Sequence, residues 1–148
     1  MKEFCVKSIA AATLLAAAMA ATSAFAEDPS PGLWEISMES RVTSDPGWKP
    51  QPFILTQCLT AGDAKDPTRL IGSIASPGAS GCSYTEKSYS GNVFRFAMDC
   101  SGSYRLRSRG EVNFSASSFN GRITTSGSIN GQATEFSNLV SGRRVGSC

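Results

Sequence analysis

Alternating apolar and polar residues recur along most of this chain, and a period of two is typical of β-strands that bury one face. In residues 33–42, Trp34 and Met38 belong to an apolar series interleaved with glutamate and serine. Turn sequences such as Asn130-Gly131, a strong hairpin signal, separate the alternating segments. We therefore predict short antiparallel strands at residues 33–42, 53–59, 83–89, 93–100, 104–114, 119–127 and 132–142.

The fold class that follows is all-β: a single antiparallel meander forming either a strongly curved sheet or a small lipocalin-like barrel. One short helix is expected over residues 61–65, because Thr60 is a favourable N-cap and Asp63 stands at the third helical position before Pro67. Residues 73–81 are expected to form a loop. The apolar positions of the strands should converge on one interior that includes Trp34, Phe94, Phe96, Met98, Leu106 and Phe114.

Residues 1–26 have the features of a signal peptide. Lys2 and Lys7 precede an apolar stretch, and Ala24-Phe25-Ala26 fits the small-x-small cleavage rule, which places cleavage before Glu27. The alternative is an uncleaved anchor, but the apolar stretch is shorter than the roughly 20 residues that span a bilayer. We expect residues 27–148 to be one β domain, periplasmic or secreted, with no transmembrane segment.

Cysteine usage supports this compartment. The chain has five cysteines, and removal of Cys5 with the leader leaves Cys58, Cys82, Cys100 and Cys148. An even number in a small exported domain predicts two disulfides, for which three pairings are open. We favour Cys58–Cys82 with Cys100–Cys148, because the first pair flanks a proline-bearing insert and the second pair ends two predicted strands. The wide spacing argues against a zinc site.

Several chemistries are excluded by composition. The chain contains no histidine, so it has no histidine base, histidine metal ligand or Ser-His-Asp triad. A net charge of +2 argues against nucleic acid as the main partner. Glu35 and Glu39 share a strand face, but they alternate with apolar residues and should face water. We expect a non-enzymatic protein with no catalytic residues, cofactor or metal.

Arginines form the first candidate binding surface. Arg105, Arg107 and Arg109 follow one another at a spacing of two, and Arg95 and Arg122 lie on the neighbouring predicted strands. Such a face could hold an anion, a lipid head group or an acidic partner. The alternative interpretation is a solvated sheet face balanced by nearby carboxylates.

The two tryptophans are further candidates. Gly32-Leu33-Trp34 fits the G-x-W motif that opens the first strand of lipocalins, and Arg143 or Arg144 could cover Trp34 through a cation–π contact. Alternatively, Trp34 only fills a core. Trp48 lies on a loop bounded by prolines, where it would either fold over the mouth of the barrel or anchor a partner.

Several short motifs are also familiar in their order along the chain. They are Pro31-Gly32-Leu33-Trp34-Glu35, Gln57-Cys58-Leu59-Thr60, Gly81-Cys82, Cys100-Ser101-Gly102, Gly110-Glu111-Val112 and Ser141-Gly142-Arg143-Arg144-Val145-Gly146-Ser147-Cys148. Their order resembles that of the domain-of-unknown-function 3617 family, small exported proteins mainly of proteobacteria. The resemblance covers residues 29–148 and implies an exported envelope protein. It implies no activity, cofactor or catalytic residue.

Two functions therefore remain in view. The first is binding of a small apolar or amphipathic ligand, or of an envelope component, inside the curved sheet or at its mouth. The alternative is a protein–protein interaction module of the cell envelope that uses the arginine-rich face and Trp48. An apolar void of a few hundred Å³, roughly the size of known ligand pockets, would favour the first. An interior filled by side chains would favour the second.

Overall fold

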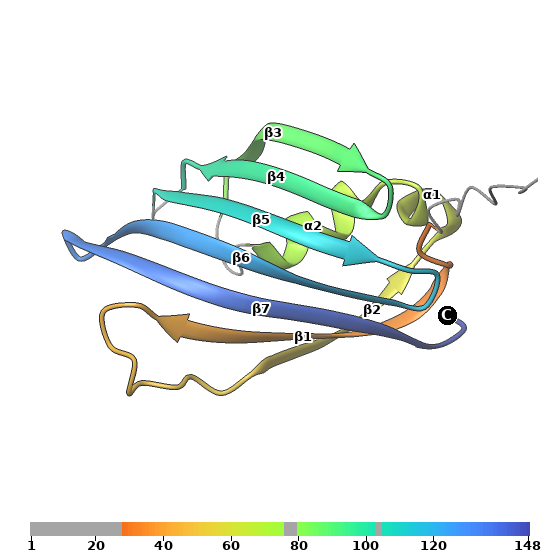
Figure 1. Ribbon diagram of the computed structural model, residues 1–148, viewed down its shortest axis with the longest axis horizontal. Helices are drawn as coiled ribbons and strands as arrows, with labels where there is room; N and C mark the ends of the chain where they lie inside the picture. The colour runs from red at the N-terminus through yellow and green to blue at the C-terminus, as the bar shows by residue number, and fades with distance from the viewer. Residues whose placement is uncertain (1–27, 76–79, 103–104) are drawn as a thin grey trace, which may run out of the picture.

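The computed structural model describes residues 28–75, 80–102 and 105–148, so the predicted leader and its cleavage site lie outside the described residues. One seven-stranded antiparallel sheet dominates the fold, with the strand order β2-β1-β7-β6-β5-β4-β3. Two helices lie behind the sheet in Figure 1. The elements are β1 (Gly32–Val42), β2 (Phe53–Leu59), α1 (Ala61–Ala64), α2 (Pro67–Ala75), β3 (Cys82–Ser90), β4 (Val93–Cys100), β5 (Leu106–Phe114), β6 (Ser118–Ile129) and β7 (Gln132–Gly146).

The topology confirms a single antiparallel all-β fold. Strands β3 to β7 form a meander of hairpins, while β1 inserts between β7 and β2. The two edge strands, β2 and β3, do not pair with each other among the described residues, so the sheet is open. Of the two predicted forms, the protein adopts the sheet and not the closed barrel.

The first helix forms where the sequence predicts it. In α1, the Thr60 hydroxyl accepts a hydrogen bond from the Asp63 amide at 3.2 Å, and the Asp63 carboxylate accepts one from the Thr60 amide at 3.4 Å. This reciprocal capping box satisfies two N–H groups that the first turn cannot pair internally.

The second helix corrects the expectation of a single helix, and its last turn occupies residues that were expected to be loop. Pro67 occupies the first position of α2, where its missing N–H costs no hydrogen bond. The Asp66 carboxylate accepts a hydrogen bond from the Thr68 amide at 3.1 Å. Leu70, Ile71 and Ile74 then recur at helical spacing and point to the same side. Pro67, interpreted as the end of one helix, in fact begins the next.

Helix α2 fills the inner face of the sheet. Its side chains Leu70, Ile71 and Ile74 are at most 1% exposed and belong to the same core cluster as the apolar side chains of the strands. The six interior residues predicted from the strand pattern all lie in this cluster or pack against it. The space between helix and sheet is therefore a packed core.

Polar side chains from the strands hold α2 at both ends. The Ala75 carbonyl accepts hydrogen bonds from the Ser108 hydroxyl on β5 at 3.5 Å and from the Thr125 hydroxyl on β6 at 3.4 Å. The Tyr84 hydroxyl on β3 donates to the Thr68 carbonyl at 2.7 Å. The carbonyl groups of the last helical turn have no intrahelical partner, so the buried C-terminus of α2 needs the two hydrogen bonds to Ala75.

Tyr84 should make the stability of the protein sensitive to alkaline pH. Burial raises the pKa of Tyr84 well above its ordinary value. A raised pKa in the folded state stabilises the protein below the unfolded pKa of about 10, and this contribution is lost as the pH rises further. Tyr84→Phe should remove most of that alkaline loss. At neutral pH it should cost about 0.5–1.5 kcal/mol, because the hydrogen bond from the Tyr84 hydroxyl to the Thr68 carbonyl is lost.

Urea unfolding between neutral pH and about pH 11 would measure both effects, since ordinary tyrosines also titrate in this range. Tyr89→Phe is the matched control, because the Tyr89 ring is 54% exposed although burial raises its pKa as well. An alkaline loss that persists in Tyr84→Phe and disappears in Tyr89→Phe would contradict the assignment.

Candidate functional site

The arginine-rich face is largely balanced by carboxylates on the adjacent strands. Three of its arginines form ion pairs: Arg95 with Glu111 at 2.7 Å, Arg107 with Asp99 at 3.0 Å, and Arg109 with Glu86 at 3.9 Å. These side chains are exposed, so each pair contributes at most about 1 kcal/mol to stability. Among the described residues, Arg105 and Arg122 form no ion pair. The face thus holds fewer free cations than its sequence suggests.

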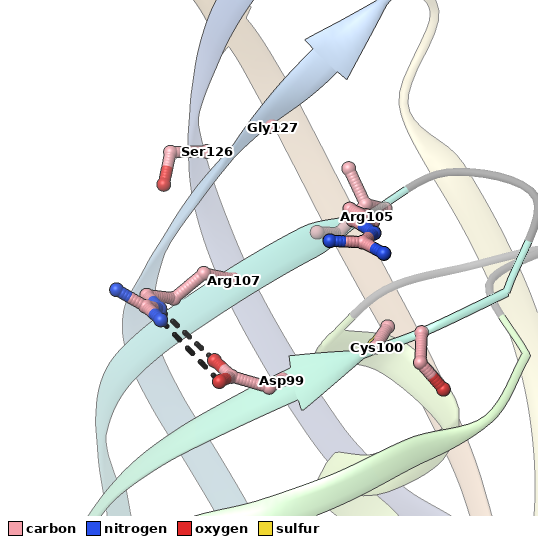
Figure 2. A pocket seen from close by; sticks show the side chains of 8 residues that line it. Asp99, Cys100, Arg105, Arg107, Ser126 and Gly127 are labelled. Carbon is pink, nitrogen blue, oxygen red and sulfur yellow. Dashed lines mark hydrogen bonds and ion pairs between the residues drawn. The ribbon is translucent and has the colours of Figure 1, made fainter.

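A groove lies where β4 ends and β5 begins, and we call it the end groove. Figure 2 shows Arg105 and Arg107 along the start of β5, opposite Asp99. Its volume is about 490 Å³, and its lining residues are Asp99, Cys100, Ser101, Arg105, Leu106, Arg107, Ser126 and Gly127. Two of the predicted candidate arginines therefore share one depression, whereas Arg109 lies outside it.

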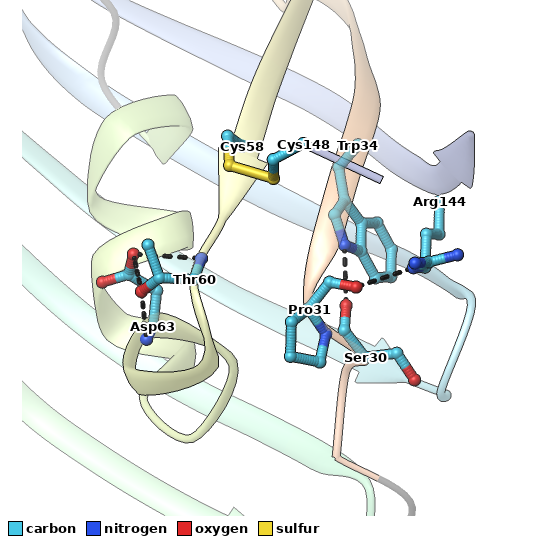
Figure 3. The surroundings of a disulfide bond; sticks show 8 residues. All are labelled: Ser30, Pro31, Trp34, Cys58, Thr60, Asp63, Arg144 and Cys148. Atoms are coloured by element: carbon cyan, nitrogen blue, oxygen red, sulfur yellow. Dashed lines mark hydrogen bonds between the residues drawn. A yellow bond between two sulfur atoms is a disulfide. The ribbon is translucent and has the colours of Figure 1, made fainter. Parts of the chain in front are cut away.

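The disulfides correct the favoured pairing. Cys58 is bonded to Cys148, with a Cα–Cα distance of 5.6 Å and a sequence separation of 90 (Figure 3). The reason is the place of β1: Leu33 lies opposite Cys58 on β2 and opposite Gly146 on β7. The chain after β7 crosses the start of β1 and meets β2. The disulfide thus joins segments on either side of the first strand.

The other disulfide joins Cys82 to Cys100 within one hairpin. The two residues are direct cross-strand partners in the register of β3 and β4. The prediction of two disulfides among Cys58, Cys82, Cys100 and Cys148 is confirmed, and the pairing Cys58–Cys82 with Cys100–Cys148 was wrong. Disulfides of this kind persist in oxidising compartments.

Residues 28–31 form a short segment across the end of the sheet, which we call the strap. The Trp34 indole N–H donates to the Ser30 carbonyl at 3.0 Å, and the Arg144 guanidinium donates to the Pro31 carbonyl at 2.7 Å (Figure 3). The Ser30 amide also donates to the Ala116 carbonyl at 2.9 Å. Three hydrogen bonds therefore fix the strap against β1, β7 and the β5–β6 turn.

Trp34 is fully buried and packs in the core. Its ring stacks on Phe119 with 5.9 Å between centroids. Arg143 forms an ion pair with Glu35 at 2.8 Å, and Arg144 bonds to the strap. Neither arginine makes the expected cation–π contact with Trp34 in the part of the chain that the structure describes.

Trp48 lies far from the strap along the sheet. It is 51% exposed on the β1–β2 loop, and its amide donates to the Asp45 carboxylate at 3.3 Å. The strap precedes the first residue of β1, whereas this loop follows the last one, so Trp48 stands at the opposite end of the strand.

A second cavity opens beside the strap, at the mouth between helices and sheet, and we call it the mouth pocket. It measures about 280 Å³ and is lined by Asp28, Pro29, Lys65, Pro67, Tyr89, Gly91, Asn92, Phe94 and Phe114. These residues come from the strap, the α1–α2 junction, the β3–β4 hairpin and the end of β5. Sequence reasoning placed Phe94 and Phe114 in the interior but missed Lys65 and Tyr89.

The mouth pocket combines an aromatic wall with two charged residues of opposite sign, Lys65 and Asp28. The Tyr89 ring stacks on Phe94 with 4.7 Å between centroids. The Asn92 side-chain amide donates to the Phe114 carbonyl at 3.2 Å, and the Phe114 amide donates to the Asn92 carbonyl at 2.8 Å, which fixes the turn. Lys65 is exposed and has no ion pair within residues 28–75, 80–102 and 105–148.

The model of the family described as "Protein of unknown function (DUF3617)" matches residues 29–148. The chain belongs to this family. The family suggested by the cysteine contexts is therefore confirmed. No curated protein and no solved structure matches the chain. The matched span contains both disulfides and every lining residue of the mouth pocket except Asp28.

Two further observations concern the described part of the DUF3617 domain. No helix there is long and apolar enough to cross a membrane. The same residues contain no group of three or more histidine, cysteine, aspartate or glutamate side chains suited to a metal ion.

Proposed function

We propose that this DUF3617 protein is an exported, non-enzymatic binding protein that holds a small amphipathic ligand in the mouth pocket. The observation that carries the proposal is the pairing of an aromatic wall with a free lysine in one preformed cavity. Ligand pockets in proteins are mostly apolar concavities with a few polar groups that orient the ligand. The mouth pocket has this composition.

The packing of α2 supports a binding site at the mouth and not in the interior. Ile71 and Ile74 are fully buried between helix and sheet, so a ligand inside the sheet would have to displace the helix. The mouth pocket requires no such displacement. Its volume of about 280 Å³ lies near the lower limit of known ligand pockets and suits a small molecule of one or two rings.

The lining residues suggest the chemistry of the ligand. Tyr89 offers a half-exposed ring face for stacking, and such aromatic pairs contribute about 0.5–1.5 kcal/mol beyond the buried area. Lys65 favours an anionic group of the ligand close to its ammonium group, away from the Asp28 carboxylate in the same lining. A small aromatic or aliphatic carboxylate would satisfy both. Export is supported by the leader-like residues 1–26 and by two disulfides, which form in oxidising compartments.

The exposed Trp48 favours a second candidate function, a protein–protein interaction module of the cell envelope. Trp48 is 51% exposed, and Phe53 and Ile54 on the adjoining edge strand are 44% and 64% exposed. Aromatic side chains of this kind are common anchors at interfaces. The arginine-rich face adds less to this interpretation, because three of its cations already have carboxylate partners.

Binding of phenylacetate and its neutral analogue phenylethanol, followed by amide NMR shifts, would test the mouth pocket. Saturable shifts are expected around Tyr89–Asn92 and Lys65. Tyr89→Ala should weaken both ligands by roughly 2- to 10-fold, the equivalent of one aromatic pair. Lys65→Gln should weaken phenylacetate and leave phenylethanol unchanged.

Lys49→Gln is the matched control. Lys49 lies on the β1–β2 loop beside Trp48, so this substitution removes the same charge away from the mouth pocket. If Lys49→Gln and Lys65→Gln weaken phenylacetate binding equally, the effect arises from the net charge of the protein and not from a contact with Lys65. The absence of saturable shifts at the pocket across aromatic and aliphatic carboxylates would refute the proposal. Shifts confined to Trp48 and its neighbours would favour the interaction module.

A further inference from the structure

The end groove has a different chemistry from the mouth pocket. Arg105 is exposed and has no ion pair among the described residues, so all its N–H donors are free of carboxylates. Arg107 binds Asp99 through Nε at 3.0 Å and Nη2 at 3.4 Å, which leaves Nη1 outside that pair (Figure 2). With two arginines and one carboxylate in its lining, the groove carries a net positive charge.

The floor of the groove is held in place by covalent and hydrogen bonds. Cys100 is linked to Cys82, and the next residue, Ser101, donates from both its amide and its hydroxyl to the Gly81 carbonyl, at 3.1 Å and 3.2 Å. The ion pair with Asp99 also restricts the orientation of the Arg107 side chain. A site whose donors are already fixed loses less entropy when it binds.

Gly127 lets the chain at Arg105 and Leu106, where β5 begins, approach β6 closely. A Cβ at Gly127 would lie 2.7 Å from the Arg105 carbonyl oxygen and against the Leu106 side chain. Any larger residue would push the start of β5 away. Ser126, directly opposite Arg107 in the register, adds a hydroxyl to the lining. Arg105, Arg107 and Ser126 thus present hydrogen-bond donors to one depression.

We propose that the end groove binds the oxyanion of a small molecule or head group, a carboxylate or a phosphate, with Arg105 as its principal ligand. Arginine presents a planar fork of donors that matches two oxygens of such a group. Arg107 and the Ser126 hydroxyl supply the further donors. This site is independent of the mouth pocket, because the two cavities share no lining residue.

Titration of the protein with inorganic phosphate, and separately with acetate, at constant ionic strength would test the site. Saturable amide NMR shifts are expected at Ser101, Arg105 to Arg107, Ser126 and Gly127. Arg105→Gln should weaken binding by roughly tenfold or more, which corresponds to the loss of a charge-assisted hydrogen bond. Arg122→Gln is the matched control, because Arg122 is an exposed arginine without an ion pair in the described part of the chain and lies outside the groove.

Ser126→Asp provides a second variant that leaves both arginines in place. It adds a negative charge to the lining and should abolish phosphate binding, while circular dichroism confirms that the sheet remains folded. Phosphate binding that survives both Arg105→Gln and Ser126→Asp would overturn the proposal. Equal weakening by Arg122→Gln would also overturn it, since the effect would then be a general charge effect.

Co-sedimentation with vesicles would identify the source of the oxyanion. Sedimentation with phosphatidylcholine vesicles that contain phosphatidylglycerol, lost in Arg105→Gln, would assign the groove to a lipid head group. Saturable binding of free phosphate or acetate without sedimentation would assign it to a small soluble anion. An absence of both would refute the site, whatever the mouth pocket binds.

Discussion

Replacing Ile71 with alanine is expected to lower the free energy of unfolding by about 2–5 kcal/mol. Ile71 is fully buried at the centre of α2 and packs in the core cluster between helix and sheet. The substitution removes three carbon atoms from a site whose surroundings are fixed by the strands, so it leaves a cavity. Urea unfolding followed by circular dichroism would measure the change.

Ile54→Ala is the matched control, since Ile54 is 64% exposed on the edge strand β2. Its effect should stay within about 0.5 kcal/mol, as for most surface substitutions. An Ile71→Ala variant as stable as Ile54→Ala would show that α2 is only loosely attached. The inner face of the sheet would then be open to a ligand, against the location proposed above.

The disulfides should differ in their contribution to stability. The bond between Cys58 and Cys148 closes a segment of 90 residues, whereas the bond between Cys82 and Cys100 closes one of 18. On the chain-entropy model, the double serine substitution of the first pair should cost about 4–5 kcal/mol and that of the second about 3 kcal/mol. Thermal or urea unfolding of the two double variants would compare them.

Non-reducing peptide mapping of the wild-type protein would check the pairing itself. Proteolytic fragments that contain Cys58 and Cys148 should migrate as one linked species. A fragment linking Cys58 to Cys82 would instead support the pairing that the sequence favoured and contradict the observed one. Equal stability losses in the two double variants would argue against the dependence on loop length.

The strands were predictable because their alternation is local. Residues 53–59 and 93–100 match β2 and β4 at both ends, and the other boundaries differ by a few residues. The predicted segment 104–114 begins at Tyr104, which lies outside the described residues, and β5 begins at Leu106. The last strand extends four residues beyond its predicted end because β1 pairs with it almost to the C-terminus.

The pairing of Cys82 with Cys100 was within reach of the sequence. Gly91 and Asn92, which separate the strands predicted at residues 83–89 and 93–100, lie midway between the two cysteines, and a one-residue bulge near Tyr84 brings the cysteines into register. The pairing of Cys58 with Cys148 could not be predicted from the sequence, because it depends on the insertion of β1 between β2 and β7. Alternation identifies strands but does not order them within a sheet.

The candidate sites likewise contain a part that a local sequence pattern predicts and a part that depends on the arrangement of the strands and helices. The spacing of two predicted that Arg105 and Arg107 lie on the same side of the chain, and both line the end groove, although Arg105 precedes the first residue of β5. The partners that neutralise the other arginines, such as Glu86 on β3, depend on the register between strands. The mouth pocket was missed because Lys65 and Tyr89 are brought together by the packing of α1 and α2 against the sheet, which no local pattern records.

The position of β1 has a consequence for the order in which the protein can fold. Its neighbour β7 comprises residues 132–146, so the centre of the sheet cannot assemble until nearly the whole chain is present. The bond to Cys148 cannot form before the last residue arrives. If the chain is exported as proposed, its first strand stays without its partner β7 until the end of transit, and pairing between segments far apart in sequence is slow. Under that proposal, the sheet would be completed in the same compartment in which the disulfides form.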